Sequence, residues 1–418
     1  MPARRPVHRR RDRCRACGSM RLDRFLELGA QPLANAFVRD PAEFATEAHY
    51  PLDLYFCEGC GLVQLLDVID PEVLFRDYIY VTGTSSTIAA HNERYARTIL
   101  AMLDAEPNDL IVEIASNDGS LLSRFAQQGV RTLGIEPARN IAALARERGI
   151  ETVERFFDIE TAEDARATHG AARAVIANNV LAHVDDTLGF LRAGRTLVAD
   201  DGIVAVEVPY VREMLERLEY DTVYHEHLCY FSIGALLRLF ENAGLRVIKV
   251  ERVPVHGGSI RVYAVPDVRL GEHARGVLAL AEEEREHGIT SLDRWRRFAA
   301  DVAANRRALL DLLRSLTRNG SVVAGYGAPA KGNTLLNYCG IGNEILPFTV
   351  DRNPLKVGLF TPGMHLPVLP VEAILERQPD YVLILAWNFA DEIMNQLTQY
   401  RERGGRFIVP VPTPSVVS

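Results

Sequence analysis

The chain has 418 residues, of which 48% are hydrophobic and 24% are charged. This length predicts about two or three domains, each able to bury its own core, and the composition is typical of a globular protein. The net charge of −8 argues against nucleic acid as the main partner. No apolar run is long enough to span a membrane or follows the basic start as in a signal peptide, so we expect a cytoplasmic protein.

Two Cys-x-x-Cys pairs come first along the chain: Cys14, Cys17, Cys57 and Cys60. Together they can supply the four thiolates of a tetrahedral zinc site. Gly18 and Gly61 follow the second cysteine of each pair and allow the backbone to turn tightly. A disulfide and a redox dithiol are the alternatives, but a redox motif would not need a matching second pair. The cysteines therefore predict a closed, structural zinc site in a module spanning residues 1–73.

Apolar segments alternate with amphipathic ones over residues 74–270. We predict strands at 110–114, 132–135, 174–177 and 203–209, and helices at 121–128 and 141–148. Such alternation is typical of an α/β domain with a parallel, doubly wound, Rossmann-like sheet.

The first of these strands ends in Glu113-Ile-Ala-Ser-Asn117-Asp118-Gly119. Ligands of such sheets bind at the carboxyl ends of strands, where the next helix offers free amides. A dinucleotide fingerprint needs three spaced glycines, but only Gly119 is present, and the two acidic side chains would repel a phosphate. A cationic or zwitterionic ligand suits this loop better.

Residues on the later strands complete this picture. Glu136 ends the next strand and is placed to accept both hydroxyls of a ribose, while Phe157 and Asp158 offer a wall and an acceptor for adenine. Asn178 ends a further strand at the same edge. Together with the acidic loop, these residues predict a site for S-adenosylmethionine. The alternative is a strand-to-helix turn with a purely structural role.

A cluster of polar residues lies at Tyr224-His225-Glu226-His227. A carboxylate beside an imidazole can orient it and raise its basicity, which favours acid/base catalysis with Glu226 orienting His227. Metal binding and buried structural hydrogen bonding are the alternatives, although the two histidines lack the four-residue spacing of zinc proteases. His183 follows a strand and is expected at the lip of the site, and Tyr78 precedes the central sheet, where aromatic packing is equally expected.

The last part, residues 271–418, begins with a charged, helical stretch at 272–316, which we interpret as one or two solvated helices that join two domains. A second α/β pattern follows, with strands at 321–325, 348–350, 381–385 and 407–411 and a helix at 330–336. It predicts a second Rossmann-like domain. Its loop Gly325-Tyr-Gly-Ala-Pro-Ala-Lys331 lacks the third spaced glycine of an NAD site, although Asp351 keeps an NAD-dependent oxidoreductase or epimerase open as an alternative.

Several motifs together resemble one known family. They are the four cysteines, Pro32-Leu-Ala-Asn35, Glu113-Ile-Ala-Ser-Asn-Asp-Gly119, Tyr224-His-Glu-His227, His256-Gly-Gly-Ser-Ile-Arg261 and Gly325-Tyr-Gly-Ala-Pro-Ala-Lys331-Gly332. In this order they resemble the S-adenosylmethionine-dependent sugar C-methyltransferases, which act on nucleotide-linked deoxysugars of antibiotics. The resemblance spans about Cys14 to Val411 and is greatest to the C-3 methyltransferases of the tetronitrose and kijanose type.

The resemblance implies roles for particular residues. It makes His227 the catalytic base and adds further catalytic positions at Glu226, Tyr224, His183 and Tyr78. It also implies that the C-terminal domain holds the nucleotide, with Lys331 near the diphosphate and Tyr326 in the same loop. Arg261 and Lys356 are weaker candidates for binding the substrate.

The expected activity is therefore the methylation of C-3 in a dTDP-linked 4-keto deoxysugar, by deprotonation to an enolate that attacks the methyl group of S-adenosylmethionine. Methylation at C-5 is an alternative. A zinc-ribbon module for nucleic acid is a further alternative, which the acidic balance disfavours. We expect a small-molecule substrate, no nucleic acid or membrane partner, and a monomer.

Overall fold

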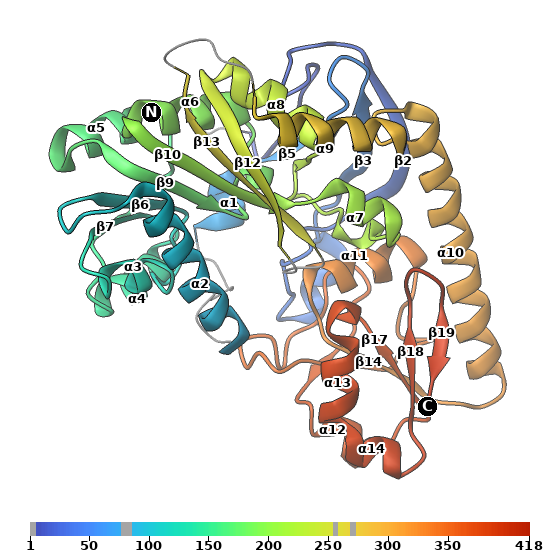
Figure 1. Ribbon diagram of the computed structural model, residues 1–418. Coiled ribbons are helices and arrows are strands. Elements are labelled where there is room, and N and C mark those ends of the chain that lie inside the picture. The colour runs from blue at the N-terminus through green and yellow to red at the C-terminus, as the bar shows by residue number, and fades with distance from the viewer. Residues whose placement is uncertain (1–5, 77–85, 254–257, 268–272) are drawn as a thin grey trace.

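The computed structural model describes residues 6–76, 86–253, 258–267 and 273–418 of the chain. Figure 1 shows the N-terminal module and the central sheet in the upper half and the C-terminal sheet in the lower half, with the long helix α10 (Leu292–Arg318) along one side of both. Among the described residues, no helix combines the length and the apolarity that crossing a bilayer requires.

The N-terminal module is built from short strands around the cysteine pairs. Its elements are β1 (His8–Arg10), β2 (Leu22–Gln31), η1 (Pro41–Thr46), β3 (Tyr50–Cys57), β4 (Val63–Leu65), β5 (Asp67–Ile69) and α1 (Pro71–Phe75). Its main sheet has the order β11-β4-β3-β2, in which β11 (Cys229–Tyr230) comes from the central part of the chain. The segment just after His227 is therefore fixed to the N-terminal module by an antiparallel strand pair.

The central domain is a seven-stranded sheet in the order β12-β13-β10-β9-β6-β7-β8. Its strands are β6 (Leu110–Ile114), β7 (Arg131–Ile135), β8 (Thr152–Val153), β9 (Ala172–Asn178), β10 (Val198–Pro209), β12 (Leu245–Val253) and β13 (Ser259–Pro266). Its helical elements are α2 (Ser86–Leu103), α3 (Leu122–Ala126), α4 (Arg139–Glu147), α5 (Ile159–His169), η3 (Leu181–His183), α6 (Thr187–Leu197), α7 (Val211–Glu216), η4 (Tyr220–Thr222) and α8 (Ile233–Asn242).

The pairing of these strands confirms the predicted doubly wound sheet. Strands β8, β7, β6, β9 and β10 run parallel, while β13 pairs antiparallel with both β10 and β12. All five residues of β6 are buried, as expected for a parallel strand that is covered on both faces. The carboxyl ends of the parallel strands consequently meet along one edge, where such sheets bind ligands.

Two helices, α9 (Arg275–Glu286) and α10, join the central and C-terminal domains, as predicted. The expectation that this stretch is a solvated linker is wrong, because α10 buries an apolar stripe that includes Trp295, Phe298 and Leu309. The ring of Trp295 lies 5.3 Å from that of Phe25 in the N-terminal module. The helix is therefore a packed support, about 40 Å long, for two domains.

The C-terminal domain is a six-stranded sheet in the order β16-β15-β14-β17-β18-β19. Its elements are β14 (Val323–Tyr326), α11 (Ala330–Cys339), β15 (Thr349–Val350), β16 (Val368–Leu369), α12 (Ala373–Arg377), β17 (Tyr381–Ile384), η5 (Trp387–Phe389), α13 (Ala390–Gln396), α14 (Thr398–Glu402), β18 (Arg406–Val409) and β19 (Ser415–Val417). All pairs are parallel except β18 with β19, which confirms the predicted second Rossmann-like domain.

Helix α11 fixes this domain against the other two. The side-chain amide of Asn333 donates to the carbonyl of Ala34 at 2.7 Å, and the hydroxyl of Thr334 donates to the carbonyl of Val223 at 3.1 Å. The start of α11 is thereby held beside the turn that leads to His227.

Candidate active site

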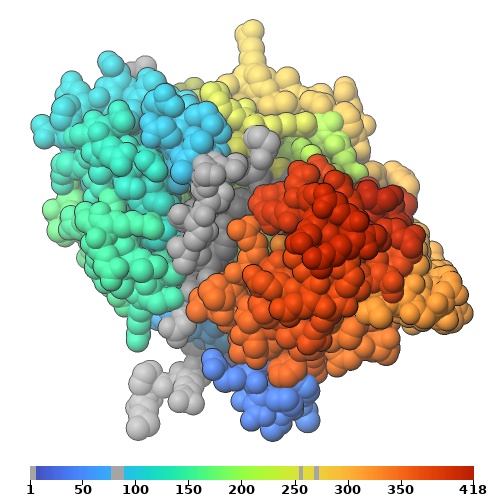
Figure 2. All heavy atoms as spheres, turned by 90° about the horizontal axis from the view of Figure 1, so that it is seen from below, coloured from blue at the N-terminus to red at the C-terminus, as the bar shows by residue number. Residues whose placement is uncertain are grey.

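A large cavity of about 1940 Å³ lies where the three parts of the chain meet. Residues that follow the carboxyl ends of β6, β7, β9 and β10 line one side, and residues that follow β14, β15 and β17 line the other. In the view of Figure 2 the cyan-to-green part of the central domain and the orange-to-red C-terminal domain lie on opposite sides. Ligand-binding edges of both sheets therefore contribute to one space.

The loop after β6 has an unusual backbone. Ala115 and Asn117 have φ angles of 52° and 49°, and Gly119 follows with 70°. A side chain at Gly119 would bring a Cβ to 3.0 Å from Ile150, so glycine is required there both for conformation and for space. The carboxylate of Asp118 is fully buried and paired with Arg148 at 2.5 Å. Asp118 and Gly119 lie outside the described cavity lining, and the structure places them as residues that shape the loop.

The other five residues predicted to bind the cofactor do line the cavity: Glu113, Asn117, Glu136, Asp158 and Asn178. Glu136 accepts from the backbone amides of Asn117 at 2.9 Å and Ala138 at 2.8 Å, and Asp158 accepts from the amide of Thr161 at 2.8 Å as the N-cap of α5. Both carboxylates are therefore held in place by the backbone.

The buried acceptors in this wall that lack a hydrogen-bond partner include Oε2 of Glu113 and Oδ1 of Asn178. Burial raises the pKa of Glu113 well above its usual value, and Asp118 and Glu136 act in the same direction. Unsatisfied buried acceptors are costly, so a ligand that brings N–H groups or positive charge would complete this wall. These acceptors fit S-adenosylmethionine, which carries an ammonium and a sulfonium.

The charge of the cavity supports the same assignment. Among the described residues, eleven aspartate and glutamate residues line it, against three lysine or arginine residues, which are Arg9, Lys331 and Arg352. Such an excess of carboxylates attracts a cationic ligand. Arg9, from the basic start of the chain, is also paired with Asp185.

His227 and Tyr224 form a hydrogen-bonded pair at the wall of the cavity. The Nδ1 atom of His227 lies 2.9 Å from the carbonyl oxygen of Thr222, and its Nε2 atom lies 2.7 Å from the hydroxyl of Tyr224. A carbonyl can only accept, so Nδ1 carries the proton and Nε2 is the basic atom. The imidazole is thus oriented with its lone pair toward Tyr224.

The expectation that Glu226 orients His227 needs correction. The carboxylate of Glu226 accepts from the side-chain amide of Asn35 at 2.6 Å, and the carbonyl of Thr222 holds the imidazole instead. Glu226 is buried outside the described cavity lining, and burial raises its pKa to about 7. Its contact links the Pro-Leu-Ala-Asn motif of the N-terminal module to the histidine cluster.

The other two histidines of this region differ in their roles. His183 lines the cavity, its ring lies 4.8 Å from that of His227, and burial lowers its pKa to about 4. It is therefore a neutral imidazole, and its buried Nδ1 has no hydrogen-bond partner. His225 points elsewhere and bonds the carbonyls of Tyr50 and Pro51, each at 3.2 Å. Tyr78 lies outside the described residues.

The four cysteines come together as predicted. Their sulfur atoms all lie within 4.8 Å of one another, with Cys14 and Cys60 separated by 3.6 Å and Cys17 and Cys57 by 3.5 Å. Ligands of a tetrahedral zinc ion are about 3.8 Å apart, whereas disulfide sulfurs are about 2.05 Å apart. The geometry fits zinc and excludes the disulfide alternative.

This cysteine cluster is structural and is the one metal-ligand group in the described part of the chain. The amides of Gly18 and Gly61 close the two turns on the carbonyls of Cys14 and Cys57 at 3.0 and 2.8 Å. None of the four cysteines lines the described cavity. Metal binding by His225 and His227, which the sequence left open, is therefore not supported.

The four residues predicted to bind the substrate divide into two groups. Tyr326 and Lys331 line the cavity, but Arg261 and Lys356 lie outside its described lining. Arg261 is buried, bonds Glu207 at 2.6 and 3.1 Å, and stacks over the ring of Tyr95 at 3.3 Å. Lys356 donates to the carbonyl of Ala328 at 2.8 Å and supports the glycine loop from behind.

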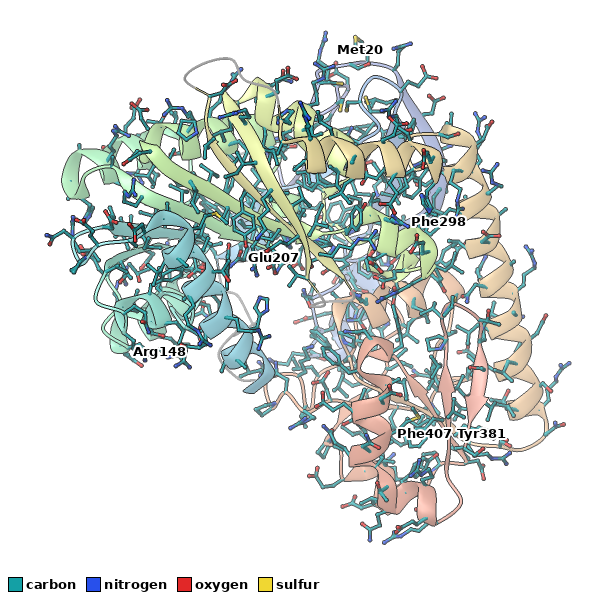
Figure 3. The ribbon with its side chains drawn as sticks, in the orientation of Figure 1. Met20, Arg148, Glu207, Phe298, Tyr381 and Phe407 are labelled. Carbon is teal, nitrogen blue, oxygen red and sulfur yellow. The ribbon has the colours of Figure 1, made fainter. Side chains whose placement is uncertain are left out.

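The structure also brings in residues that the sequence did not single out. Glu207, at the end of β10, lines the cavity close to the centre of the molecule (Figure 3). Arg261, Asn179 at 3.4 Å and His91 surround its carboxylate. The carboxyl end of a predicted strand was the available signal for Glu207. Glu219 and Thr222, which also line the cavity, had no such signal.

Comparison with known proteins identifies the architecture. Three family models match consecutive parts of the chain: "Putative zinc binding domain" at residues 14–75, "Methyltransferase domain" at 88–250, and "C-methyltransferase C-terminal domain" at 254–412. The C-methyltransferase NovU of Streptomyces niveus is 40% identical over 407 residues, which are 97% of each chain. An uncharacterized methyltransferase of Alkaliphilus oremlandii is 29% identical and covers 32% of this chain and 65% of its own length.

Among solved structures, magnesium protoporphyrin IX methyltransferase of Synechocystis with bound S-adenosylmethionine is 14% identical, with a TM-score of 0.36, over 47% of this chain and 98% of that one. At that score the likeness adds nothing to the assignment. The match to NovU along the full length excludes the oxidoreductase and nucleic-acid-module alternatives. The chain belongs to the family of S-adenosylmethionine-dependent C-methyltransferases that combine a zinc-binding domain, a methyltransferase domain and a C-terminal domain.

Proposed function

We propose that this C-methyltransferase adds a methyl group to C-3 of a dTDP-linked 4-keto deoxysugar, in the biosynthesis of a branched sugar. The single observation that carries the proposal is the His227–Tyr224 pair, with a basic Nε2 atom at the wall of a cavity shared by two ligand-binding sheet edges. We propose that the chain has three domains, at residues 1–73, 74–270 and 271–418. The nucleotide-sugar would lie between the second domain and the third.

A ketone makes the hydrogen on the neighbouring carbon acidic, because the charge left behind spreads onto oxygen. In the proposed mechanism, Nε2 of His227 takes this proton, and the electron pair of the C–H bond moves into the enolate. As Nε2 takes the proton, the hydroxyl of Tyr224 turns its own proton from Nε2 toward the developing enolate oxygen, and the neutral imidazole of His183 stands beside it. A preorganised donor at the developing charge is the main source of rate in such a step.

The cofactor supplies an electrophilic methyl group on sulfur. The new C–C bond at the enolate carbon would balance the broken S–CH₃ bond, with S-adenosylhomocysteine as the leaving group and the ketone restored. The protein contributes alignment, since Glu136 and Asn117 on one sheet and Tyr326 on the other hold the two ligands against each other. His227 keeps the proton until it passes to solvent.

The nucleotide part is proposed to lie along the C-terminal sheet. Tyr326 ends β14 and Arg352 follows β15, so both stand at the ligand-binding edge. The side chain of Arg352 is 68% exposed and lies 3.8 Å from Glu392, which is a loose ion pair. Arg352 is therefore the cation best placed to exchange its partner for a diphosphate.

Turnover with defined substrates tests the proposal. The protein is incubated with S-adenosylmethionine and a panel of dTDP-4-keto deoxysugars, the product mass is measured, and the position of the new group is found by NMR. The expected product has gained one methylene unit on C-3. Methylation at C-5 would show that the proton is removed from C-5 and not from C-3. Methylation of an oxygen or nitrogen would overturn the enolate mechanism.

A further inference from the structure

A second group of polar side chains lies beside the cavity and has no role in the mechanism above. The ammonium nitrogen of Lys331 lies 3.8 Å from Oε2 of Glu219 and 5.2 Å from the ring of Trp387. The indole N–H of Trp387 in turn donates to the carboxylate of Asp221 at 2.6 Å. Glu219 and Lys331 line the cavity, and the four side chains together are called the Lys331 cluster.

The cluster has unused hydrogen-bonding capacity. Nζ of Lys331, Oε1 of Glu219 and Oδ1 of Asp221 are all shielded from solvent and lack a hydrogen-bond partner. An ammonium can donate three hydrogen bonds and a carboxylate can accept several. Leaving such groups unpaired costs about 1–3 kcal/mol for each group. A ligand group that pairs with two of them at once would remove much of this cost.

The charges of the cluster decide which ligand group fits. Two carboxylates surround one ammonium, so a diphosphate would meet repulsion there, and Lys331 is a poor choice for the diphosphate role implied by the family resemblance. Burial raises the pKa of Glu219 to about 7, which shows how unfavourable a further negative charge is at this point. A positively charged amine would meet the ammonium of Lys331. A hydroxyl fits both partners, because it accepts from Nζ and donates to the carboxylate.

Hydrogen bonds connect the Lys331 cluster to the proposed base, His227. The hydroxyl of Thr222 donates to the carbonyl of Glu219 at 2.8 Å, and the carbonyl of Thr222 accepts from His227 at 2.9 Å. On the other side, Thr334 ties α11, which carries Lys331, to the carbonyl of Val223. A sugar that reaches His227 therefore lies against a turn whose other end presents Glu219.

We propose that Glu219 and Lys331 bind a ring hydroxyl of the sugar and make the enzyme selective for substrates that keep this hydroxyl over their deoxy analogues. The inference rests on the proposed function, since it names a specificity contact of the same site. A site built to hydrogen-bond a hydroxyl rejects the analogue without it, because its own buried groups then stay unpaired. With one ammonium and one carboxylate involved, the preference is expected to be roughly 100-fold.

The test uses dTDP-4-keto sugars in which each ring hydroxyl in turn is replaced by hydrogen. Affinity is measured by calorimetry with S-adenosylhomocysteine bound, and kcat/KM is measured with S-adenosylmethionine. In the wild type, one hydroxyl should raise both quantities by roughly 100-fold over its deoxy partner. In Glu219→Ala, Lys331→Met and the double variant, the preference for the hydroxylated sugar over its deoxy analogue should fall below about 10-fold. The main cause should be weaker binding of the hydroxylated sugar.

Arg352→Met is the matched control, since it removes a cation from the same wall of the cavity. This variant should weaken the binding of all the sugars to the same extent and leave the preference for the hydroxylated sugar over its deoxy analogue unchanged. The inference is overturned if the wild type does not distinguish any pair, or if the ratio survives in the folded double variant. The proposed function fails separately if the wild type methylates no sugar, and the binding ratios would still decide the role of the Lys331 cluster.

Discussion

Replacing His227 by asparagine tests the role of its Nε2 atom without removing the whole side chain. Asparagine can still donate to the carbonyl of Thr222, the contact that Nδ1 makes at 2.9 Å. It has no group at the position of Nε2, which lies 2.7 Å from the hydroxyl of Tyr224. We therefore expect the fold and cofactor binding to be kept while the base is lost.

The expected loss can be given a magnitude. Removal of one positioned base typically lowers the rate by about 10²- to 10⁴-fold, which corresponds to about 2.7–5.4 kcal/mol in the activation free energy. The free energy of unfolding should change by only about 1 kcal/mol, because one buried hydrogen bond to a neutral group is lost. Single-turnover rates with saturating S-adenosylmethionine and urea unfolding give the two numbers.

His225→Asn is the matched control, two residues away. His225 bonds the carbonyls of Tyr50 and Pro51 and lies outside the described cavity lining. Its loss should lower the free energy of unfolding by about 1–3 kcal/mol and leave the single-turnover rate within about threefold. If His227→Asn kept more than a tenth of the wild-type rate, or if both variants lost rate equally, the assignment of His227 would be refuted.

Three further predictions concern the cofactor, the metal and pH. Glu136→Gln should weaken S-adenosylhomocysteine binding in calorimetry at least about tenfold, because the amide cannot accept from two backbone N–H groups and a ribose together; an unchanged affinity would remove Glu136 from the site. Cys57→Ser should lose the single zinc ion in metal analysis and unfold at lower temperature, whereas Cys339→Ala, a buried cysteine outside the cluster, should keep its zinc; zinc retained in both would contradict the assignment. Burial lowers the pKa of His225 to about 4, whereas the unfolded imidazole titrates near about 6.5, so protons favour the unfolded state as the pH falls between these values. From about pH 7.5 to about pH 5 the wild type should therefore lose about 2 kcal/mol more of its unfolding free energy than His225→Asn, and parallel pH dependences would show that this histidine is not buried as a neutral group.

The sequence predicted the fold well because its signals are local. The strand at 110–114 coincides with β6, and the strand at 203–209 forms the end of β10. The alternation of strands and helices determined both parallel sheets, and two short cysteine motifs determined the zinc cluster. The helical stretch before the last domain was misinterpreted as solvated, since its charged residues hide the apolar stripe of α10.

The details of the site depend on contacts between distant residues, which local patterns do not contain. Asn35 and Glu226 are 191 positions apart in sequence, so their hydrogen bond could not be predicted from the histidine cluster alone. Lys331 similarly carries a positive charge that suggests a phosphate ligand, until Glu219 is seen beside it. In both cases a contact with a distant residue changes the chemical role that the local sequence implies.

The removal of a proton from carbon by His227 can be observed apart from methyl transfer. In D₂O, with S-adenosylhomocysteine in place of the methyl donor, the wild type should exchange the hydrogen beside the ketone for deuterium, as followed by NMR of the dTDP-4-keto sugar. His227→Asn should slow this exchange by about 10²-fold or more, while His225→Asn should leave it within about threefold. Exchange at the wild-type rate in His227→Asn would contradict the account.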